Sequence, residues 1–442
     1  MMLKRDLVRY IALCGAAIIC FGAAPAGEVL PYQVAGDVAE SYRLLTTTYF
    51  DPVDAHVLLA AASEALVDNA HKHGVTIPAP ALQVDNDRDA TVSELDDAIA
   101  AAAHSAHAQP SEFAYSAINA MAKAVNDRYT QFFTPAEFKS FNEALDPARI
   151  GGIGVMIGPD AASGFVRLTY VLPGTPAERA GLQVGDLVES VNGTPTKGLA
   201  VDAVSALLRG QAGTIVSVTL SRNNSTSVVS ITRDNVQPPT VIYRMLANNI
   251  GYVWVMTFGR ATPTEFDAAI SRLHEQGARA LVFDLRNDGG GYVDSALNIS
   301  SRFIANKALL TVEERGRHDT TIDAEDSPSV TMPVTVLVNQ YTASASEITA
   351  GALQDDGIAM LVGSKTFGKG VMQTLTPLPD GAAIKITTAH YLTPNRRDIN
   401  LRGIQPDIQI DENRDARFGD ADHDAQLRAA ITQLQKEIAT KN

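Results

Sequence analysis

The residues that decide the fold are NQYTASASEI at positions 339–348, where a short apolar run meets a turn of small and hydroxyl-bearing residues. The apolar run, residues 334–339, predicts a buried strand, and residues 346–354 predict a helix. A strand that passes directly into a helix is typical of a layered α/β core. The turn also places the hydroxyl groups of Ser344 and Ser346 beside the start of a helix.

The same alternation continues on the N-terminal side of this turn. Residues 251–256 and 280–285 predict strands, and residues 263–276 and 292–304 predict helices. We therefore expect one α/β layered core over residues 240–410.

Two further regions precede this core. Residues 38–145 are rich in alanine and carry apolar residues at helical spacing, which predicts a helical N-terminal region. Prolines interrupt it, and we expect an insertion over residues 78–109 whose role the sequence does not give. Residues 148–235 hold short β-branched runs between glycine-containing turns, which predicts a β-rich domain. The chain is thus expected to be an α+β multidomain protein that ends in an acidic C-terminal tail and helix over residues 411–442.

The composition limits the classes of function. A chain of 442 residues predicts about three domains at roughly 100–200 residues each. Asp and Glu outnumber Lys and Arg by 50 to 36, which gives a net charge of −14, so we expect no nucleic-acid partner. Both cysteines, Cys14 and Cys20, lie in the N-terminal apolar segment. The rest of the chain therefore has no disulfide framework, thiol nucleophile or zinc–thiolate site.

Residues 1–26 have the organisation of a signal peptide. Lys4, Arg5 and Arg9 precede an apolar run over residues 10–24 that ends in small residues. The run is shorter than the roughly 20 residues that a membrane span needs. We expect cleavage after Ala26 and export to the periplasm or another extracytoplasmic compartment. Without cleavage, the segment would be an N-terminal membrane anchor.

A glycine-rich stretch opens the β-rich domain. Residues 151–155 read GGIGV, and PGTPA, AGL, GDLV and VNG follow within residues 173–193. A glycine-rich turn beside a sheet edge can bind a peptide carboxylate through its backbone N–H groups. These residues resemble a PDZ domain, with ordinary core residues of a small β-fold as the alternative. The resemblance implies a carboxylate loop and side-chain pocket formed by Gly152, Ile153, Gly154, Val155, Val204, Leu207 and Leu208.

A second glycine-rich motif lies in the predicted α/β core. Residues 284–291 read DLRNDGGG, at the end of a predicted strand and just before a predicted helix. Successive glycines let backbone N–H groups point into a cleft, and a helix N-terminus adds positive potential. Together these features suit a developing oxyanion, with a plain strand-to-helix turn as the alternative.

A third motif, GSKTFGKGVMQ at residues 363–373, completes the pattern. Together with residues 339–348 it resembles the C-terminal processing peptidases, also called tail-specific proteases, which are serine enzymes with a Ser–Lys dyad. The resemblance extends over about residues 38–410 and implies a ClpP/crotonase-like peptidase core. It includes DRYT at 127–130, YLTP at 391–394 and GIQPD at 403–407.

The resemblance assigns the catalytic groups by position. It implies that Ser344 is the nucleophile, Lys369 its general base and Gln373 the residue that orients Lys369. The backbone N–H groups of Gly290 and Ala345 are implied as the oxyanion hole. A lysine base must be neutral, and free lysine titrates near 10.4, so only about 0.04% is neutral at pH 7. We therefore expect Lys369 to be buried among apolar neighbours.

Several positions leave alternatives open. Lys365 is a rival base that we expect to be exposed, and Ser346 is a rival nucleophile whose structural role would be to cap the helix. Gly289 stands where a proline is usual in the family, which could loosen the oxyanion loop. Residues 85–96 carry oxygen ligands at some positions of a calcium loop, but its central glycine and final glutamate are missing. We expect a solvated acidic loop there, with calcium binding as the alternative.

These features predict an exported serine endopeptidase. It would capture apolar or unstructured C-terminal tails of protein substrates in its PDZ-like domain and cut through an acyl-enzyme. We expect it to need no metal or organic cofactor. The alternatives are a catalytically inactive PDZ-type binding or scaffold protein and a non-proteolytic acyl-transfer enzyme. The natural substrate, an adaptor or activator protein and a homo-oligomer stay open.

Overall fold

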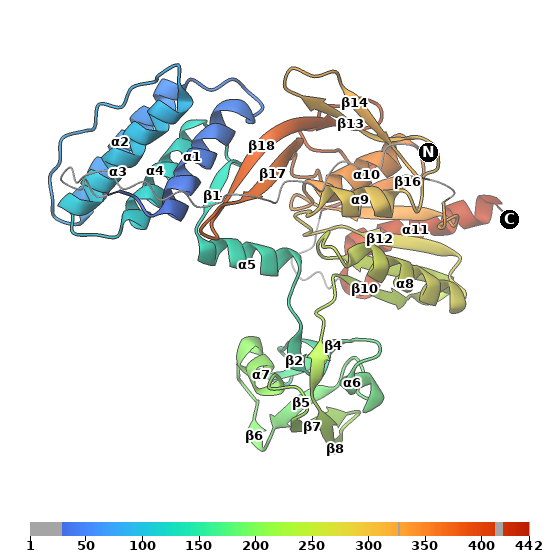
Figure 1. Cartoon of the computed structure of the whole chain (residues 1–442). Coiled ribbons are helices and arrows are strands. Elements are labelled where there is room, and N and C mark those ends of the chain that lie inside the picture. Colours follow the sequence, from blue (N-terminus) through green and yellow to red (C-terminus); the bar gives the residue numbers. More distant parts are fainter. Residues whose placement is uncertain (1–28, 326–327, 412–418, 442) are drawn as a thin grey trace, which may run out of the picture. The chain divides into compact units, whose positions relative to one another are not determined.

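The computed structural model describes residues 29–325, 328–411 and 419–441 (Figure 1). The predicted signal peptide and part of the predicted acidic tail lie outside these residues. The chain divides into two compact units, residues 29–43 with 54–125, and residues 44–53 with 126–441. The predicted α+β multidomain class is confirmed. Within the described ranges, every helix is too short or too polar to span a membrane.

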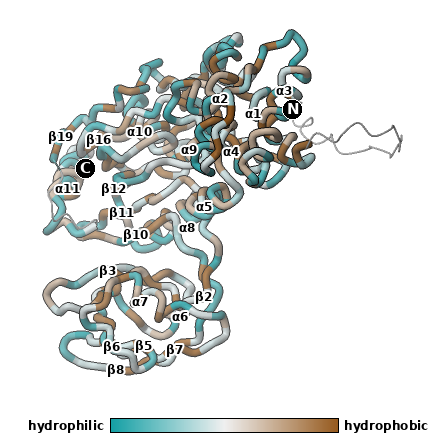
Figure 2. Tube along the Cα trace, turned by 90° about the vertical axis from the view of Figure 1, so that its left-hand side faces the viewer, coloured by the Kyte–Doolittle hydropathy of each residue, from teal (hydrophilic) through white to brown (hydrophobic). Residues whose placement is uncertain are grey.

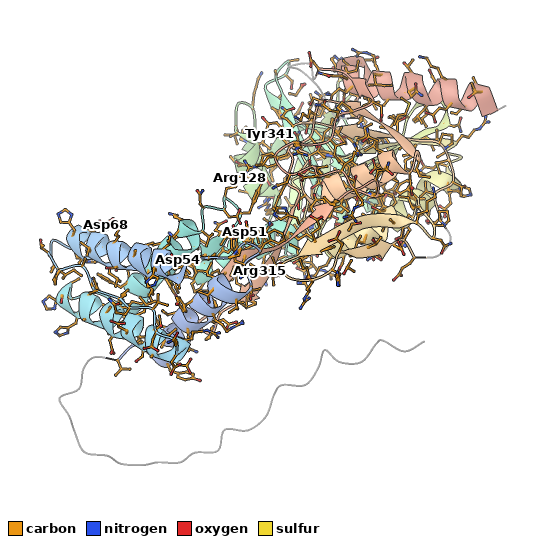
Figure 3. All side chains as sticks on the ribbon, turned by 90° about the horizontal axis from the view of Figure 1, so that it is seen from above. Asp51, Asp54, Asp68, Arg128, Arg315 and Tyr341 are labelled. Atoms are coloured by element: carbon orange, nitrogen blue, oxygen red, sulfur yellow. The ribbon has the colours of Figure 1, made fainter. Side chains whose placement is uncertain are left out.

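Four helices form the N-terminal region, and hydrophobic residues recur along α2 and α4 between hydrophilic ones (Figure 2). Asp54 caps α2 by accepting a hydrogen bond from the His56 backbone N–H (Figure 3). The segment predicted as an insertion contains α3, whose Leu95 and Ile99 are fully buried, so it contributes to the helical core. The helices are α1 (Tyr32–Thr47), α2 (Ala55–Lys72), α3 (Arg88–Ser105) and α4 (Pro110–Ala124).

The β-rich domain is an antiparallel sheet with the strand order β3-β4-β5-β7-β8. Its entry strand β2 pairs with its exit strand β9, so the chain enters and leaves the domain at one place. Inward-facing valines and leucines fill its core. The elements are β2 (Ile150–Gly152), β3 (Val155–Asp160), β4 (Phe165–Val171), α6 (Pro176–Arg179), β5 (Leu187–Val191), β6 (Thr194–Pro195), α7 (Val201–Leu208), β7 (Ile215–Arg222), β8 (Ser225–Thr232) and β9 (Asp234–Val236).

The α/β core is a three-layer structure around a six-stranded sheet with the order β10-β11-β12-β15-β16-β19. All neighbours pair in parallel except β10 and β11. Alternate residues of β12 face α8, α9 and α10 on one side and α11 on the other, so both faces of this central strand are buried and its residues before Asp284 are all apolar. The strands are β10 (Val241–Met245), β11 (Ile250–Val255), β12 (Ala280–Asp284), β15 (Val334–Val338), β16 (Ala359–Gly363) and β19 (Ile408–Gln409).

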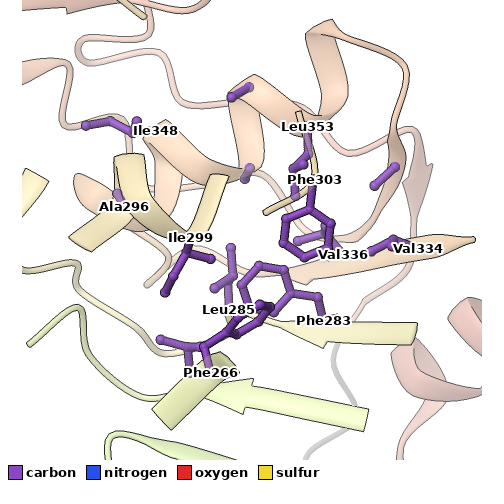
Figure 4. Packing of buried hydrophobic residues seen from close by; sticks show 14 of the residues in the cluster. Phe266, Phe283, Leu285, Ala296, Ile299, Phe303, Val334, Val336, Ile348 and Leu353 are labelled. Atoms are coloured by element: carbon purple, nitrogen blue, oxygen red, sulfur yellow. The ribbon is translucent and has the colours of Figure 1, made fainter. Parts of the chain in front are cut away.

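Three phenylalanines lie at the centre of the larger hydrophobic cluster, on the side of the sheet that α8–α10 cover (Figure 4). The rings of Phe283 and Phe303 are stacked with centroids 5.7 Å apart, and Phe266 packs against both. The helices and 3-10 turns of this core are η1 (Ala247–Asn249), α8 (Thr262–Glu275), α9 (Val293–Ser300), α10 (Ala345–Asp355), η2 (Ala421–His423) and α11 (Ala425–Lys441).

A second sheet, which the sequence analysis did not predict, lies beside this core (Figure 1). Its long strand β18 pairs with β17 over residues 383–390, with β1 over residues 383–385 and with β13 over residues 389–392, and β13 also pairs with β14. The sheet brings residues from near position 130 next to residues from near position 385. Its elements are β1 (Gln131–Phe133), α5 (Pro135–Leu145), β13 (Ala308–Glu314), β14 (Thr320–Asp323), β17 (Val371–Pro377) and β18 (Ala383–Leu392).

Candidate active site

The turn between β15 and α10 holds Ser344 in a strained backbone conformation. Its φ of 59° and ψ of −119° cost a non-glycine residue on the order of 1–3 kcal/mol, and such strain gathers at functional sites. Ser344 is the N-cap of α10, so the prediction that Ser346 caps this helix is wrong. Ser346 lies inside the first turn, where it is fully buried and its hydroxyl donates to the Asp288 carbonyl at 3.1 Å.

A cavity of about 430 Å³ contains the three side chains that the resemblance singles out. Ser344, Lys369 and Gln373 all line it, together with the glycines of residues 289–291. Lys365, the rival base, is exposed outside this lining, as we expected. Apolar side chains from α5, α10, β17 and β18 form most of the remaining wall: Phe141, Leu145, Ile348, Val371, Met372, Leu375 and Tyr391.

Lys369 is buried enough to make its neutral form accessible. Burial is the largest effect and, with the nearby charge of Lys385, lowers the pKa of Lys369 to about 8, while Asp127 and Glu347 oppose the shift. With that pKa, about 9% of the lysine is neutral at pH 7. Its ammonium group lies 5.1 Å from the centroid of the Tyr129 ring. The chemistry expected of a lysine base is therefore available at this position.

Gln373 contacts a polar group on the neighbouring strand. Its amide donates to the Thr387 hydroxyl at 3.4 Å, and that hydroxyl donates to the Asp127 carboxylate at 2.6 Å. Asp127 also accepts from the Thr130 hydroxyl and from the Tyr129 backbone N–H. An orienting role for Gln373 toward Lys369 therefore rests on their shared cavity and stays a prediction.

The glycine loop approaches Ser344 very closely. Gly290 has a φ of +96°, and a Cβ there would lie 2.7 Å from the Ala343 carbonyl oxygen and 2.8 Å from the Ala345 nitrogen, so only glycine fits. A Cβ at Gly289 would meet nothing within 4 Å, so the space around this position does not itself require glycine. The loop thus places its backbone against the nucleophile candidate.

The two predicted oxyanion donors differ in this structure. The Gly290 N–H donates to the Asp288 carboxyl at 2.8 Å, so it is engaged inside the loop. Burial raises the pKa of Asp288 well above its usual value. The Ala345 N–H is the first of α10, and the first N–H groups of a helix have no acceptor within it. The conformation described here therefore offers the Ala345 donor, whereas the Gly290 donor would first have to leave Asp288.

Glu347 connects the turn that holds Ser344 with the loop that holds Lys369, a role that the sequence analysis missed. Its fully buried carboxylate accepts from the backbone N–H groups of Ser344 at 3.0 Å and of Gly368 and Lys369 at 2.8 Å, and from the Thr366 hydroxyl at 2.5 Å. Burial raises its pKa, and these donors oppose the rise. The available signal was an acid three residues after Ser344, which is the spacing of a capping box.

The strand preceding the glycine loop is fixed by a buried ion network that the sequence analysis also missed. Arg286 is fully buried and pairs with Asp284 at 2.6 Å and with Asp424 at 2.7 Å. Gln426 accepts a further hydrogen bond from Arg286, and Tyr252 donates to Asp284. Asp424 and Gln426 flank the start of α11, so residues after position 411 help to hold the loop.

The β-rich domain has a separate groove of about 400 Å³. The predicted loop residues Gly152, Ile153, Gly154 and Val155 line it. From α7 the structure brings Val201, Ser205 and Leu208 to the groove, which share one helical face. Val204 is fully buried in the domain core instead, and Leu207 packs partly buried against that core. Of the three α7 residues predicted for the pocket, Leu208 therefore lines the groove and Val204 and Leu207 do not.

The acidic stretch at residues 85–96 shows ordinary capping contacts. The carboxylates of Asp85 and Asp87 accept from the backbone N–H groups of Asp87 and Asp89. Among the described residues, no group of three or more His, Cys, Asp or Glu side chains could hold a metal ion.

Comparisons with known proteins agree with the motifs. A family model for "Peptidase family S41" matches residues 249–410, and one for a "PDZ domain" matches residues 167–222. A carboxyl-terminal-processing protease of Picosynechococcus sp. is 35% identical over 334 residues, which cover 74% of this chain and 80% of that protein. The carboxy-terminal processing protease CtpA of Bacillus subtilis is 34% identical over 327 residues, 74% of this chain and 70% of that protein. Among solved structures, a photosystem II D1 C-terminal processing protease is 28% identical and covers 86% of this chain and 94% of its own, with a TM-score of 0.45.

Proposed function

Because the chain belongs to the carboxyl-terminal-processing proteases, serine-type peptidases of family S41 with a PDZ domain, we propose that Ser344 is its nucleophile and Lys369 its general base. The observation that carries the proposal is one cavity lined by a strained serine and by a buried lysine with a lowered pKa. The family assignment agrees with the resemblance that the motifs gave.

The proposed cycle follows from these positions. Neutral Lys369 accepts the hydroxyl proton as Ser344 Oγ attacks the scissile carbonyl carbon, and it then gives that proton to the leaving amine. The ester of Ser344 is the acyl-enzyme, and Lys369 removes a proton from the water that attacks it and returns that proton to Ser344 Oγ as the ester bond breaks. The Ala345 N–H stabilises the oxyanion, and the Gly290 N–H joins it once released from Asp288.

The groove of the PDZ domain is the proposed binding site for the tail of the substrate. Its glycine-rich loop and the side chains of Val201 and Leu208 on α7 suit an extended peptide that ends in a carboxylate. A tail held there has a raised effective concentration at the catalytic cavity, so unstructured protein tails are the proposed substrates. The signal-peptide pattern of residues 1–26 supports an exported enzyme.

The test is cleavage of an unfolded reporter protein with an apolar C-terminal tail. We expect the wild-type chain to cut, Ser344→Ala and Lys369→Ala to lose cutting, and Lys365→Ala, which changes the exposed lysine of the same loop, to keep it. A fluorophosphonate probe, which labels activated serines, should label the wild type and not Ser344→Ala. Tail binding without cutting or labelling in the wild type would contradict the proposal and favour a scaffold protein.

A further inference from the structure

A second lysine, Lys385, lines the same cavity as Ser344. It lies on β18, whose pairing with β17 shifts register between Thr387 and Ala389. Two other residues of this strand contact the candidate site: Thr387 accepts from Gln373 on β17, and the Tyr391 hydroxyl donates to the Lys369 carbonyl at 2.6 Å. β18 therefore places Lys385 in the lining of the cavity that Ser344 also lines.

The surroundings of Lys385 leave its charge unpaired. Its ammonium group lies 5.2 Å from the ring centroid of Phe133 and 5.4 Å from that of Phe141, and 3.5 Å from the Gln131 amide oxygen. Within residues 29–325, 328–411 and 419–441, no carboxylate forms an ion pair with it. Asp127 is the acid whose charge acts on it, and that carboxylate already accepts three hydrogen bonds from other groups.

A mostly buried cation without an anion is costly to keep. Removing an ammonium group from water is unfavourable unless an opposite charge or several acceptors replace the water. Burial accordingly lowers the pKa of Lys385, and the Asp127 charge opposes this. Two aromatic faces and one distant amide oxygen compensate only in part. An incoming anion would supply the missing partner.

We propose that Lys385 binds a carboxylate of the peptide held at Ser344, an inference that rests on the proposed function of this cavity. The cavity of about 430 Å³ is at the small end of the range for ligand pockets and holds a few side chains, so this carboxylate lies within a few residues of the scissile bond. The free C-terminus of a short tail and the side chain of an aspartate or glutamate share this chemistry.

One experiment tests whether the carboxylate that Lys385 binds belongs to an acidic side chain of the peptide. Reporter peptides with identical C-terminal tails carry glutamate or glutamine at one position at a time around the cut. We expect wild-type kcat/KM to favour glutamate at one position by at least about tenfold, as for a hydrogen bond to a charged group. Lys385→Met should bring this ratio close to one, Lys385→Arg should keep it, and Lys365→Met, in the exposed control lysine, should leave it as in the wild type.

A second experiment tests whether the carboxylate that Lys385 binds is the free C-terminus of the peptide. Peptides that end in a free carboxylate or in an amide close to the cut are compared in the wild type and in Lys385→Met. The PDZ groove also discriminates between these ends, but its contribution is the same in both proteins and cancels when their ratios are compared. If Lys385→Met removes only the preference for a free carboxylate over an amide, the bound group is the C-terminus. If it removes only the preference for glutamate over glutamine, the bound group is an acidic side chain.

Measurements of peptide affinity test this inference separately from the proposed function, because they do not require cutting. In Ser344→Ala, fluorescence anisotropy gives the affinity for each peptide pair with and without Lys385→Met, and the carboxylate preference is expected only with Lys385. Cutting that does not require Ser344 would refute the proposed function while leaving this readout intact. A Lys385→Met protein that weakens carboxylate and neutral peptides by the same factor would overturn the inference, because the lysine would then act on Lys369 or on the fold.

Discussion

In the proposed cycle, Lys369 has to lose its charge before it accepts the Ser344 proton, and its surroundings lower its pKa to about 8, which makes the neutral form accessible at moderate pH. Burial acts most strongly, and the like charge of Lys385 acts in the same direction. Ser344 contributes strain in its backbone, and Glu347 connects the backbones of both residues. Apart from the strain in the Ser344 backbone itself, the proposed pair is thus prepared by groups that do not react with substrate.

The first prediction concerns pH. If neutral Lys369 is the active form, as proposed, its pKa of about 8 means that kcat/KM should rise about tenfold per pH unit below that value and level off above it. The measurement is a pH profile on one unfolded substrate between pH 6 and 9, with a check that the protein stays folded. A flat profile below pH 8 would argue against lysine as the base.

The second prediction concerns stability. A lysine whose pKa is about 8 when folded and 10.5 otherwise binds fewer protons in the folded state between these values. Stability therefore rises with pH across that window, and the penalty is fully present below pH 8. Lys369→Met removes the penalty and is expected to raise the free energy of unfolding by roughly 1–3 kcal/mol at pH 7, and by much less near pH 10.5.

Urea unfolding at both pH values measures this effect, with Lys365→Met as the exposed control that should change little at either. The inactive Lys369→Met protein would then be more stable than the active one. A loss of stability at pH 7 would show that the amine forms favourable contacts that outweigh its desolvation.

At the scale of elements, the candidate oxyanion loop depends on structure that lies beyond the matched peptidase region. The family model ends at residue 410, yet α11 covers one face of the central sheet, and Asp424 before it pairs with Arg286. Arg286 begins the loop that carries Gly290. The C-terminal segment is therefore part of the support of the candidate oxyanion loop.

The third prediction follows from this contact. Asp424→Asn weakens a buried charged pair and is expected to lower the free energy of unfolding by about 2–4 kcal/mol and to lower kcat. Asp422→Asn, in an exposed residue of the same segment, should be close to neutral. Urea unfolding and kcat under native conditions check both variants. Equal behaviour of the two would mean that Asp284 alone satisfies Arg286.

The elements differ in how well the sequence predicted them. β12 and β15 were predictable because both faces are buried and their residues are mostly apolar. β17 and β18 were not, because polar residues such as Lys385, Thr387 and Thr388 interrupt the apolar pattern of β18. Ser344 and Lys369 lie in local motifs, whereas Asp127 and Thr387 are 260 positions apart, and only the folded sheet joins them.

At the scale of the molecule, the proposed sites for binding a tail and for cutting it belong to different domains. The PDZ domain is inserted between α5 and β10, and its groove and the catalytic cavity are lined by separate sets of residues apart from Met256. A change confined to the groove should therefore act on substrate capture and leave the chemical step intact. This separation gives the last prediction.

Ser205→Glu places a negative charge in the groove where a tail carboxylate is expected to bind. We expect it to raise KM for a tailed reporter by about tenfold, with kcat unchanged, and to leave cleavage of a short amidated peptide as in the wild type. Ala206→Glu, an exposed neighbour on the same helix, is the matched control and should change neither. A fall in kcat on the amidated peptide would show instead that the state of the groove controls the Ser344–Lys369 pair.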